Sequence, residues 1–168
     1  MLCWNLVACI FLAATPGVLS VNGSFEQGLE GWKATVVPPV TADVISLDDR
    51  SAVRLVVPPE AAIRYPSVRQ TYSVTPGVVL SAYVEALGRN ISNGYGVYAT
   101  IEFHNAQGER ISFVQSEAAL PDGRWRPLRV RAIAPPESVS AVLCLLLNGR
   151  GEACFTGVQV AAAPGAAL

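Results

Sequence analysis

The sequence is poor in the side chains on which metal sites, nucleophilic catalysis and nucleic-acid binding depend. Its single histidine, His104, has no cysteine or acidic cluster at a suitable spacing, which argues against a zinc site or a histidine-dependent nucleophile. The 12 basic and 13 acidic residues give a formal net charge of −1, without the positive excess that a nucleic-acid surface needs. No glycine-rich phosphate-binding motif is present. These absences argue against nucleic acid as a partner and against zinc- or nucleotide-dependent chemistry.

The sequence also lacks a helical pattern. No window has apolar residues with a convincing 3.6-residue period. Short apolar or alternating runs are instead divided by proline, glycine, asparagine and aspartate, which is typical of strands joined by tight turns. This pattern predicts an all-β antiparallel sandwich or barrel, and 168 residues suffice for one domain with a hydrophobic core. The predicted strands are residues 33–37, 53–57, 68–74, 79–87, 96–104, 111–116, 128–133, 139–147 and 154–160.

The N-terminal apolar run, residues 6–14, is too short to span a bilayer. It is followed by a Pro16-Gly17 break and small residues, which predicts a signal peptide at residues 1–20 and a secreted, extracellular product. A lipid anchor is the alternative, because the sequence L-V-A-C at residues 6–9 matches a bacterial lipid-attachment box. The folded domain is then predicted at residues 21–160, and an Ala/Pro/Gly tail or the start of a linker at residues 161–168.

Cleavage of the leader would remove Cys3 and Cys9 and leave Cys144 and Cys154. An even pair of cysteines in a secreted domain is typical of a disulfide. In a hairpin that turns at residues 148–150, the two cysteines would face each other directly, so we predict a Cys144–Cys154 disulfide. The alternative is two buried thiols that pack as small apolar groups.

Strand alternation sorts the remaining polar side chains by face. It places tyrosines, carboxylates and arginines outward, and these residue types suit sugar recognition, because a ring stacks on the apolar face of a pyranose while charged groups bond its hydroxyls. The alternative is an ordinary solvated face with cross-strand ion pairs. Two of these residues, Glu85 and Glu102, could be imagined as a glycosidase pair, but so short a chain has little to form a deep cleft, and no enzyme activity is predicted. The outward candidates are Tyr83, Glu85, Tyr98, Glu102 and Arg129.

The pattern N-G-x-F-E…G-x-x-G-W at residues 22–32 resembles the opening of the jelly-roll carbohydrate-binding modules of the galactose-binding-like group, the type that binds xylan or glucan. Further segments resemble this family in the same order, at residues 68–77, 80–85, 101–108 and 123–136. The resemblance implies a jelly-roll β-sandwich of two antiparallel sheets. It also implies non-catalytic binding of a polysaccharide or cell-surface glycan, with a catalytic domain in the parent protein as a further partner. A structural or adhesive extracellular module that binds protein or matrix is the alternative.

The resemblance also implies where ligands bind. The outward candidates would gather on one concave face, with Trp32 at its rim. The family often holds a structural calcium ion partly through the acidic residue that Glu26 matches and partly through an acidic residue in the final strand. In this sequence Thr156-Gly157 takes that second position. Because calcium needs several hard oxygen ligands, weak calcium binding or none is expected, and no other cofactor is predicted.

Overall fold

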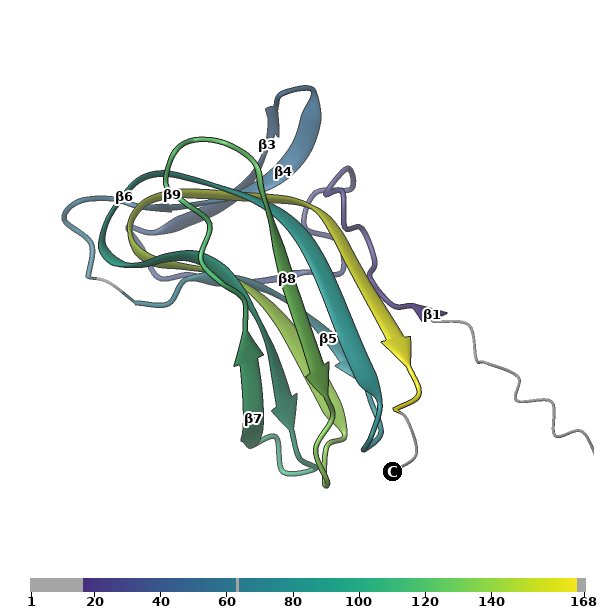
Figure 1. The fold of residues 1–168 in the computed structure, drawn as a ribbon. Helices are drawn as coiled ribbons and strands as arrows, with labels where there is room; N and C mark the ends of the chain where they lie inside the picture. The colour runs from purple at the N-terminus through teal and green to yellow at the C-terminus, as the bar shows by residue number, and fades with distance from the viewer. Residues whose placement is uncertain (1–16, 63, 166–168) are drawn as a thin grey trace, which may run out of the picture.

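The computed structural model describes residues 17–62 and 64–165, which contain nine strands and no helix (Figure 1). This confirms the predicted all-β fold. Strands form where β-branched and aromatic residues alternate with polar ones, and turns form at the Asn, Asp, Pro and Gly clusters between them. In chain order the strands are β1 (Gly17–Val18), β2 (Lys33–Thr35), β3 (Thr41–Leu47), β4 (Arg50–Val57), β5 (Ser67–Ser73), β6 (Val79–His104), β7 (Arg110–Gln115), β8 (Arg126–Ile133) and β9 (Ser140–Ala163).

Two long strands, β6 and β9, form the framework of the domain. They pair antiparallel along almost their whole length, from Val79 opposite Ala163 to His104 opposite Ser140. The register shifts between Arg89 and Gly96, and there both strands arch over together, as Figure 1 shows at the top of the molecule. The first and second halves of each strand therefore lie in different layers.

The remaining strands extend these halves into two facing layers. The layer that we call the β4 layer contains β8, the first half of β6, the second half of β9, and then β4 and β3. The β5 layer contains β7, the second half of β6, the first half of β9, and then β5 and β2. This arrangement confirms the predicted jelly-roll sandwich, with the difference that its two sheets are continuous through β6 and β9.

The core lies between the layers and follows the alternation of the strands. On β6 the even residues from 80 to 86 and the odd residues from 97 to 103 are buried in one apolar cluster. The opening segment adds Phe25 and Trp32, whose ring centroids lie 5.1 Å apart. The Trp32 side chain belongs to this core, and its indole N–H points to the Val21 and Asn22 carbonyl oxygens at 3.1 and 3.2 Å. The expectation that Trp32 lies at the rim of a binding face is therefore wrong, because its ring packs inward on Phe25.

Residues on both sides of the predicted domain, in the predicted leader and in the predicted tail, pair with the fold. Residues 17–18 form β1 beside residues 161–162, and the Leu19 N–H donates to the Val160 carbonyl oxygen at 2.8 Å. Residues 161–163 of the predicted tail belong to β9. Residues 1–16 of the predicted leader, with Cys3, Cys9 and the L-V-A-C sequence, lie outside the described residues. Among the described residues, no helix has the length and hydropathy to cross a membrane.

The predicted Cys144–Cys154 disulfide is wrong. The chain does not turn back at residues 148–150 as a hairpin, because β9 instead arches over beside β6. Cys144 lies opposite Thr100 in the β5 layer, whereas Cys154 lies opposite Leu87 in the β4 layer. Both cysteines are buried free thiols, as in the alternative interpretation.

Because these thiols are buried, we expect the folded domain to lose stability at alkaline pH. Burial, helped by the nearby Glu102 and Glu152 carboxylates, raises the pKa of Cys144 and of Cys154 to about 12 from the usual 9.0. As the pH rises above 9, the unfolded chain loses thiol protons that the folded chain keeps, so the free energy of unfolding should fall. By pH 10 the loss should be about 1.4 kcal/mol for each thiol.

Urea unfolding between pH 8 and pH 10 measures this slope. The matched control is the double variant Cys144→Ala, Cys154→Ala, which should be less stable at pH 8 but should show a shallower pH dependence. An equal slope in both proteins would contradict the prediction. Thiol titration of the denatured, unreduced protein should detect both cysteines.

Candidate functional site

The outward candidates from the sequence lie on two different surfaces. Tyr98 and Glu102 are on the outer face of the β5 layer. Tyr83, Glu85 and Arg129 are on the outer face of the β4 layer, where Tyr83 lies opposite Arg129. Because β6 arches over between its two halves, these faces point away from each other. The expectation that all five residues gather on one face is therefore wrong.

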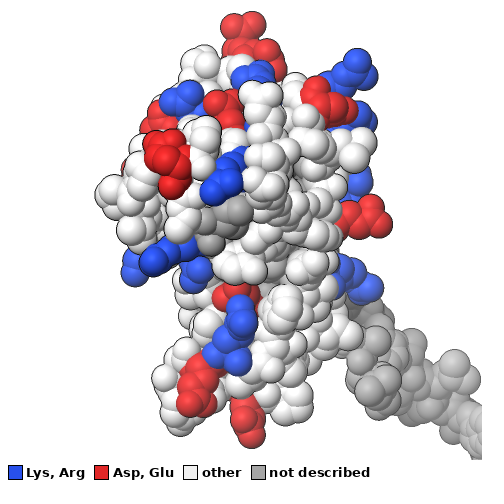
Figure 2. Space-filling view, turned by 90° about the vertical axis from the view of Figure 1, so that its left-hand side faces the viewer, with Lys and Arg blue, Asp and Glu red and all other residues white. Residues whose placement is uncertain are grey.

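The outer face of the β5 layer is hollowed. A depression with a volume of about 580 Å³ crosses β7, β6, β9 and β5. Figure 2 views the molecule from the left-hand side of Figure 1. On that side most of the surface is uncharged, and acidic and basic side chains are interspersed over it. The depression, which we call the β5-layer hollow, is lined by Tyr65, Arg69, Tyr95, Tyr98, Thr100, Glu102, Arg110, Phe113, Gln115, Leu146 and Asn148.

Partly exposed aromatic rings surround this hollow. Tyr65, Tyr95 and Phe113 are 63%, 52% and 51% exposed. The Tyr95 ring meets the buried Tyr98 ring edge-on, with centroids 5.1 Å apart and an interplanar angle of 85°. The Asn148 carboxamide oxygen accepts the Tyr95 backbone N–H at 2.7 Å, which fixes the segment that carries this ring. The Tyr95 ring is thus held in place, and all three rings keep surface free for a ligand.

A charged group with a fixed orientation lies at one end of the hollow. Glu102 is buried, and its carboxylate accepts a hydrogen bond from Arg110 at 3.2 Å, while the His104 Nε2 atom lies 3.7 Å away. The Arg110 guanidinium lies over the Phe113 ring, 5.1 Å from its centroid. Because Arg110 takes one oxygen of the carboxylate, the group presents its remaining acceptor sites in a defined direction.

The floor of the hollow carries hydroxyl groups. Burial raises the pKa of the Tyr98 hydroxyl, and the nearby Tyr65 and Tyr95 act in the same direction, so this group stays protonated and can donate a hydrogen bond at neutral pH. The Thr100 Oγ1 atom is buried and has no hydrogen-bond partner in the described part of the chain. An unpaired buried hydroxyl is costly unless a ligand or water completes it.

The candidates on the β4 layer mostly interact with neighbouring side chains of the same face. The Arg129 guanidinium lies 5.3 Å from the centroid of the Tyr83 ring. Glu85 forms an ion pair with Arg50, whose guanidinium lies over the Trp125 ring at 4.7 Å. This face corresponds to the alternative interpretation, a solvated surface with cross-strand ion pairs.

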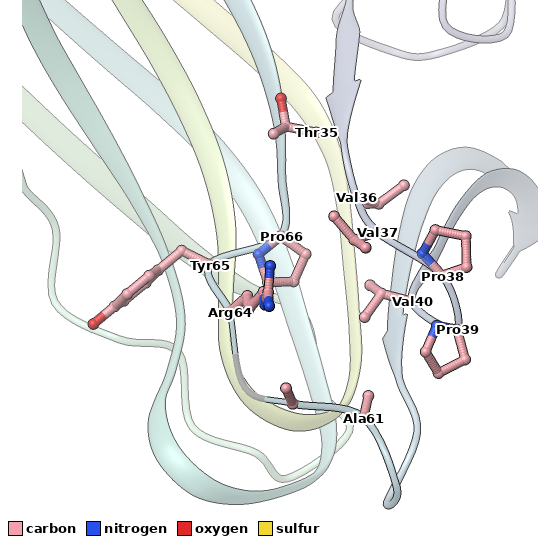
Figure 3. A pocket seen from close by; sticks show the side chains of 11 residues that line it. Thr35, Val36, Val37, Pro38, Pro39, Val40, Ala61, Arg64, Tyr65 and Pro66 are labelled. Atoms are coloured by element: carbon pink, nitrogen blue, oxygen red, sulfur yellow. The ribbon is translucent and has the colours of Figure 1, made fainter.

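A second depression lies at one end of the sandwich and is mainly apolar (Figure 3). It has a volume of about 290 Å³ and lies between residues 35–40 on one side and residues 61, 62 and 64–66 on the other. Figure 3 shows the Tyr65 ring pointing away from Val36, Val40 and the two prolines. Since sugar hydroxyls need directed hydrogen-bond partners, the β5-layer hollow fits a glycan better.

The residues do not fit the calcium site that the resemblance implies. No group of three or more His, Cys, Asp or Glu side chains in the described residues could hold a metal ion. Glu26 is exposed, and the Thr156 hydroxyl donates to the Ser51 carbonyl oxygen at 2.7 Å. The opening segment is tied to β5 by the Gln70 side chain instead, whose amide nitrogen donates to Val21 and Gly31.

Of the residues that line the hollow, sequence reasoning singled out only Tyr98 and Glu102; those it missed include Tyr65, Arg69, Tyr95, Arg110 and Phe113. Arg69 and Phe113 lie inside predicted strands, so alternation could have placed them outward once the strand pairing was known. Tyr65 precedes a proline and Tyr95 follows an Asn-Gly turn signal. In such segments the side chains do not follow the two-residue alternation of a strand, so the sequence does not show where they point.

Comparison with known proteins identifies the architecture. The sequence matches no family model and no curated protein. The structure is similar to the CBM22-1 xylan-binding domain from Paenibacillus barcinonensis Xyn10C, with a TM-score of 0.61 and 17% identity over 86% of this chain and 94% of that chain. The fold is that of the jelly-roll carbohydrate-binding modules. A CBM4 structure also matches, with a TM-score of 0.56 and 11% identity over 84% of this chain and 98% of that chain.

The jelly-roll carbohydrate-binding fold also occurs in the matches as part of larger proteins. The enzymatically active domain of bacteriophage CBA120 tailspike protein 4 matches with a TM-score of 0.65 and 18% identity over 84% of this chain. This chain spans only 21% of that protein and 26% of the arabinose-bound MgGH51 α-L-arabinofuranosidase. At these identities the likeness concerns the fold, and the activities of the larger proteins are not carried over.

Proposed function

We propose that this domain binds a polysaccharide without catalysis, in the β5-layer hollow. The observation that carries the proposal is the set of three partly exposed rings, Tyr65, Tyr95 and Phe113, around a floor of fixed polar groups. The fold shared with carbohydrate-binding modules supports it. A single face of the molecule thus offers both kinds of contact that a sugar chain requires.

In this proposal the rings and the polar floor act on different parts of the sugar. The exposed Tyr95 ring stacks on the apolar C–H face of a pyranose and removes that surface from water. Glu102 accepts from sugar hydroxyls, because its hydrogen bond with Arg110 holds it in one orientation. The unpaired Thr100 hydroxyl completes its hydrogen bonding with the ligand. A shallow hollow buries few groups, so the affinity is expected to be modest.

The carboxylate geometry supports a purely binding role. Glycosidases place two carboxyl groups about 5–10 Å apart on either side of one glycosidic bond. Glu85 and Glu102, the pair considered from the sequence, lie on the outer faces of different layers, with the core between them. Glu102 is moreover paired with Arg110 and Glu85 with Arg50, so each carboxylate already has a cationic partner.

The proposal extends to location and partners. The predicted signal peptide at residues 1–20 supports a secreted, extracellular protein, with a lipid anchor through Cys9 as the alternative. The structure of the CBM22-1-GH10 modules of Clostridium thermocellum xylanase 10B complexed with xylohexaose is also similar, with a TM-score of 0.60 and 13% identity, and this chain covers 28% of it. We therefore propose polysaccharide targeting beside a catalytic domain, with xylan as the first ligand to test.

The test compares one ring in the hollow with one ring outside it. Tyr95→Ala should weaken binding to soluble xylan or xylohexaose by at least about tenfold, because it removes the most accessible fixed ring. Tyr83→Ala is the matched control, since it removes a tyrosine from the outer face of the β4 layer. Calorimetric titration measures the affinities, and thermal unfolding verifies both folds.

If the Tyr95→Ala protein binds the ligand as tightly as wild type does, the binding site lies outside the β5-layer hollow. If wild type binds no glycan in an array screen, the adhesive module that contacts protein or matrix becomes the better interpretation.

A further inference from the structure

Two positive side chains lie side by side at one end of the β5-layer hollow. Lys33 on β2 is directly opposite Arg69 on β5. Neither forms an ion pair with a carboxylate among the described residues, and the Arg69 Nε–H donates only to the Ser67 hydroxyl, at 2.8 Å. Like charges directly opposite on neighbouring strands destabilise a sheet. The other charges of the hollow, Glu102 and Arg110, compensate each other, so this pair is a local positive excess.

The strand register connects this pair to the floor of the hollow. One outward row runs across five strands, from Lys33 through Arg69, Cys144 and Thr100 to Gln115. Four strand spacings make this row about 19 Å long. Thr100 is only 4% exposed, and its hydroxyl lacks a partner in the described residues. A chain lying along the row would thus pass the unpaired hydroxyl and end at the two positive charges.

We propose that the polysaccharide bound in this hollow carries carboxylates, that is, uronic acid residues, which Arg69 and Lys33 recognise. This inference rests on the proposed function. Among the described residues no acceptor takes the two terminal NH₂ groups of the Arg69 guanidinium, which can bind a carboxylate in a bidentate manner. The ammonium group of Lys33 supplies a second charge on the adjacent strand. A neutral chain would cover these cations without compensating them, whereas an anionic one removes their mutual repulsion.

The experiment uses one polymer in two chemical forms. Binding of the full chain to xylan substituted with glucuronic acid is compared with binding to the same xylan after its carboxylates have been reduced to alcohols. The native polymer should bind at least about tenfold more tightly, the size expected when one charge-assisted pair is lost. This preference should decrease as salt is added. Dextran sulfate in a parallel titration distinguishes carboxylate recognition from attraction of any polyanion.

The variant Lys33→Gln, Arg69→Gln should lose the preference for the native over the reduced polymer. The matched control is Arg131→Gln, which removes an exposed positive charge from the outer face of the β4 layer. It should keep the preference. Thermal unfolding verifies that each variant is folded.

Equal binding of the two polymer forms by wild type would overturn the inference and leave the proposed function intact. A preference that survives in the double variant, an equal loss in Arg131→Gln, or tighter binding of dextran sulfate would also overturn it. If neither polymer form nor neutral xylan binds, the proposed function fails, and the inference fails with it.

Discussion

Replacing Gln70 with leucine is expected to lower the free energy of unfolding by about 3 to 5 kcal/mol. Gln70 lies on β5 and is only 5% exposed. Its amide nitrogen donates to the Val21 and Gly31 carbonyl oxygens at 2.9 and 3.2 Å. Its amide oxygen accepts the Val21 N–H at 3.0 Å and the Tyr72 hydroxyl at 2.7 Å. The substitution removes all four hydrogen bonds, leaves the hydroxyl of the buried Tyr72 without its partner and detaches the Val21 and Gly31 backbone groups from β5.

The loss should be concentrated in the opening segment, residues 21–32. This segment contributes Phe25 and Trp32 to the core but has no strand of its own to hold it. Gln70 connects both of its ends, at Val21 and Gly31, to the β5 layer. Without this connection, backbone hydrogen exchange in the segment should become faster than in β6 and β9.

Chemical denaturation of the variant and wild type measures the effect. Gln27→Leu is the matched control, because Gln27 lies in the same segment but is exposed and forms its hydrogen bond to Asn22 through the backbone N–H. Its effect should stay within about 0.5 kcal/mol. A Gln70→Leu protein as stable as the Gln27→Leu protein would mean that the segment is held mainly by its aromatic side chains.

The faces of individual strands could be predicted from the sequence, because side-chain direction depends only on a period of two. Alternation placed Tyr98 and Glu102 outward, and the structure agrees, with the neighbouring Ile101 and Phe103 in the core. The positions of the turns could also be predicted, because they depend on neighbouring residues such as Asp, Asn, Pro and Gly. The Asp48-Asp49 break is the tight connection between β3 and β4, and both of its residues have positive φ.

The pairing of strands could not be predicted in this way, because it depends on contacts between residues far apart in the chain. Residues 79–87 and 96–104 were predicted as separate strands, and they are two halves of β6 in different layers. The same arch in β9 separates Cys144 from Cys154 and explains the wrong disulfide. It also explains why Tyr83 and Tyr98, both outward, belong to different faces.

The arch itself carries the last prediction. Gly94→Ala is expected to lower the free energy of unfolding by about 3 kcal/mol and to abolish measurable glycan binding. A methyl group at residue 94 would lie 2.2 Å from the Asn148 carbonyl oxygen and 2.4 Å from the Gly149 Cα atom, where β6 and β9 cross closely. Backbone atoms cannot rotate away as a flexible side chain can, so the two strands must separate. The hydrogen bond from the Tyr95 N–H to the Asn148 side chain would then lengthen, and the Tyr95 ring would leave its place beside Tyr98.

Gly28→Ala separates this steric effect from the general cost of replacing a glycine. Gly28 has a φ of +64° and nothing within 4 Å of an added methyl group, so its replacement should cost about 1 kcal/mol and leave binding unchanged. Denaturation measures the free energy of unfolding. Calorimetric titration with the polysaccharide that the wild-type protein binds measures the affinity. If Gly94→Ala binds like wild type while it is clearly destabilised, the arch supports the fold alone, and the position of Tyr95 does not depend on it.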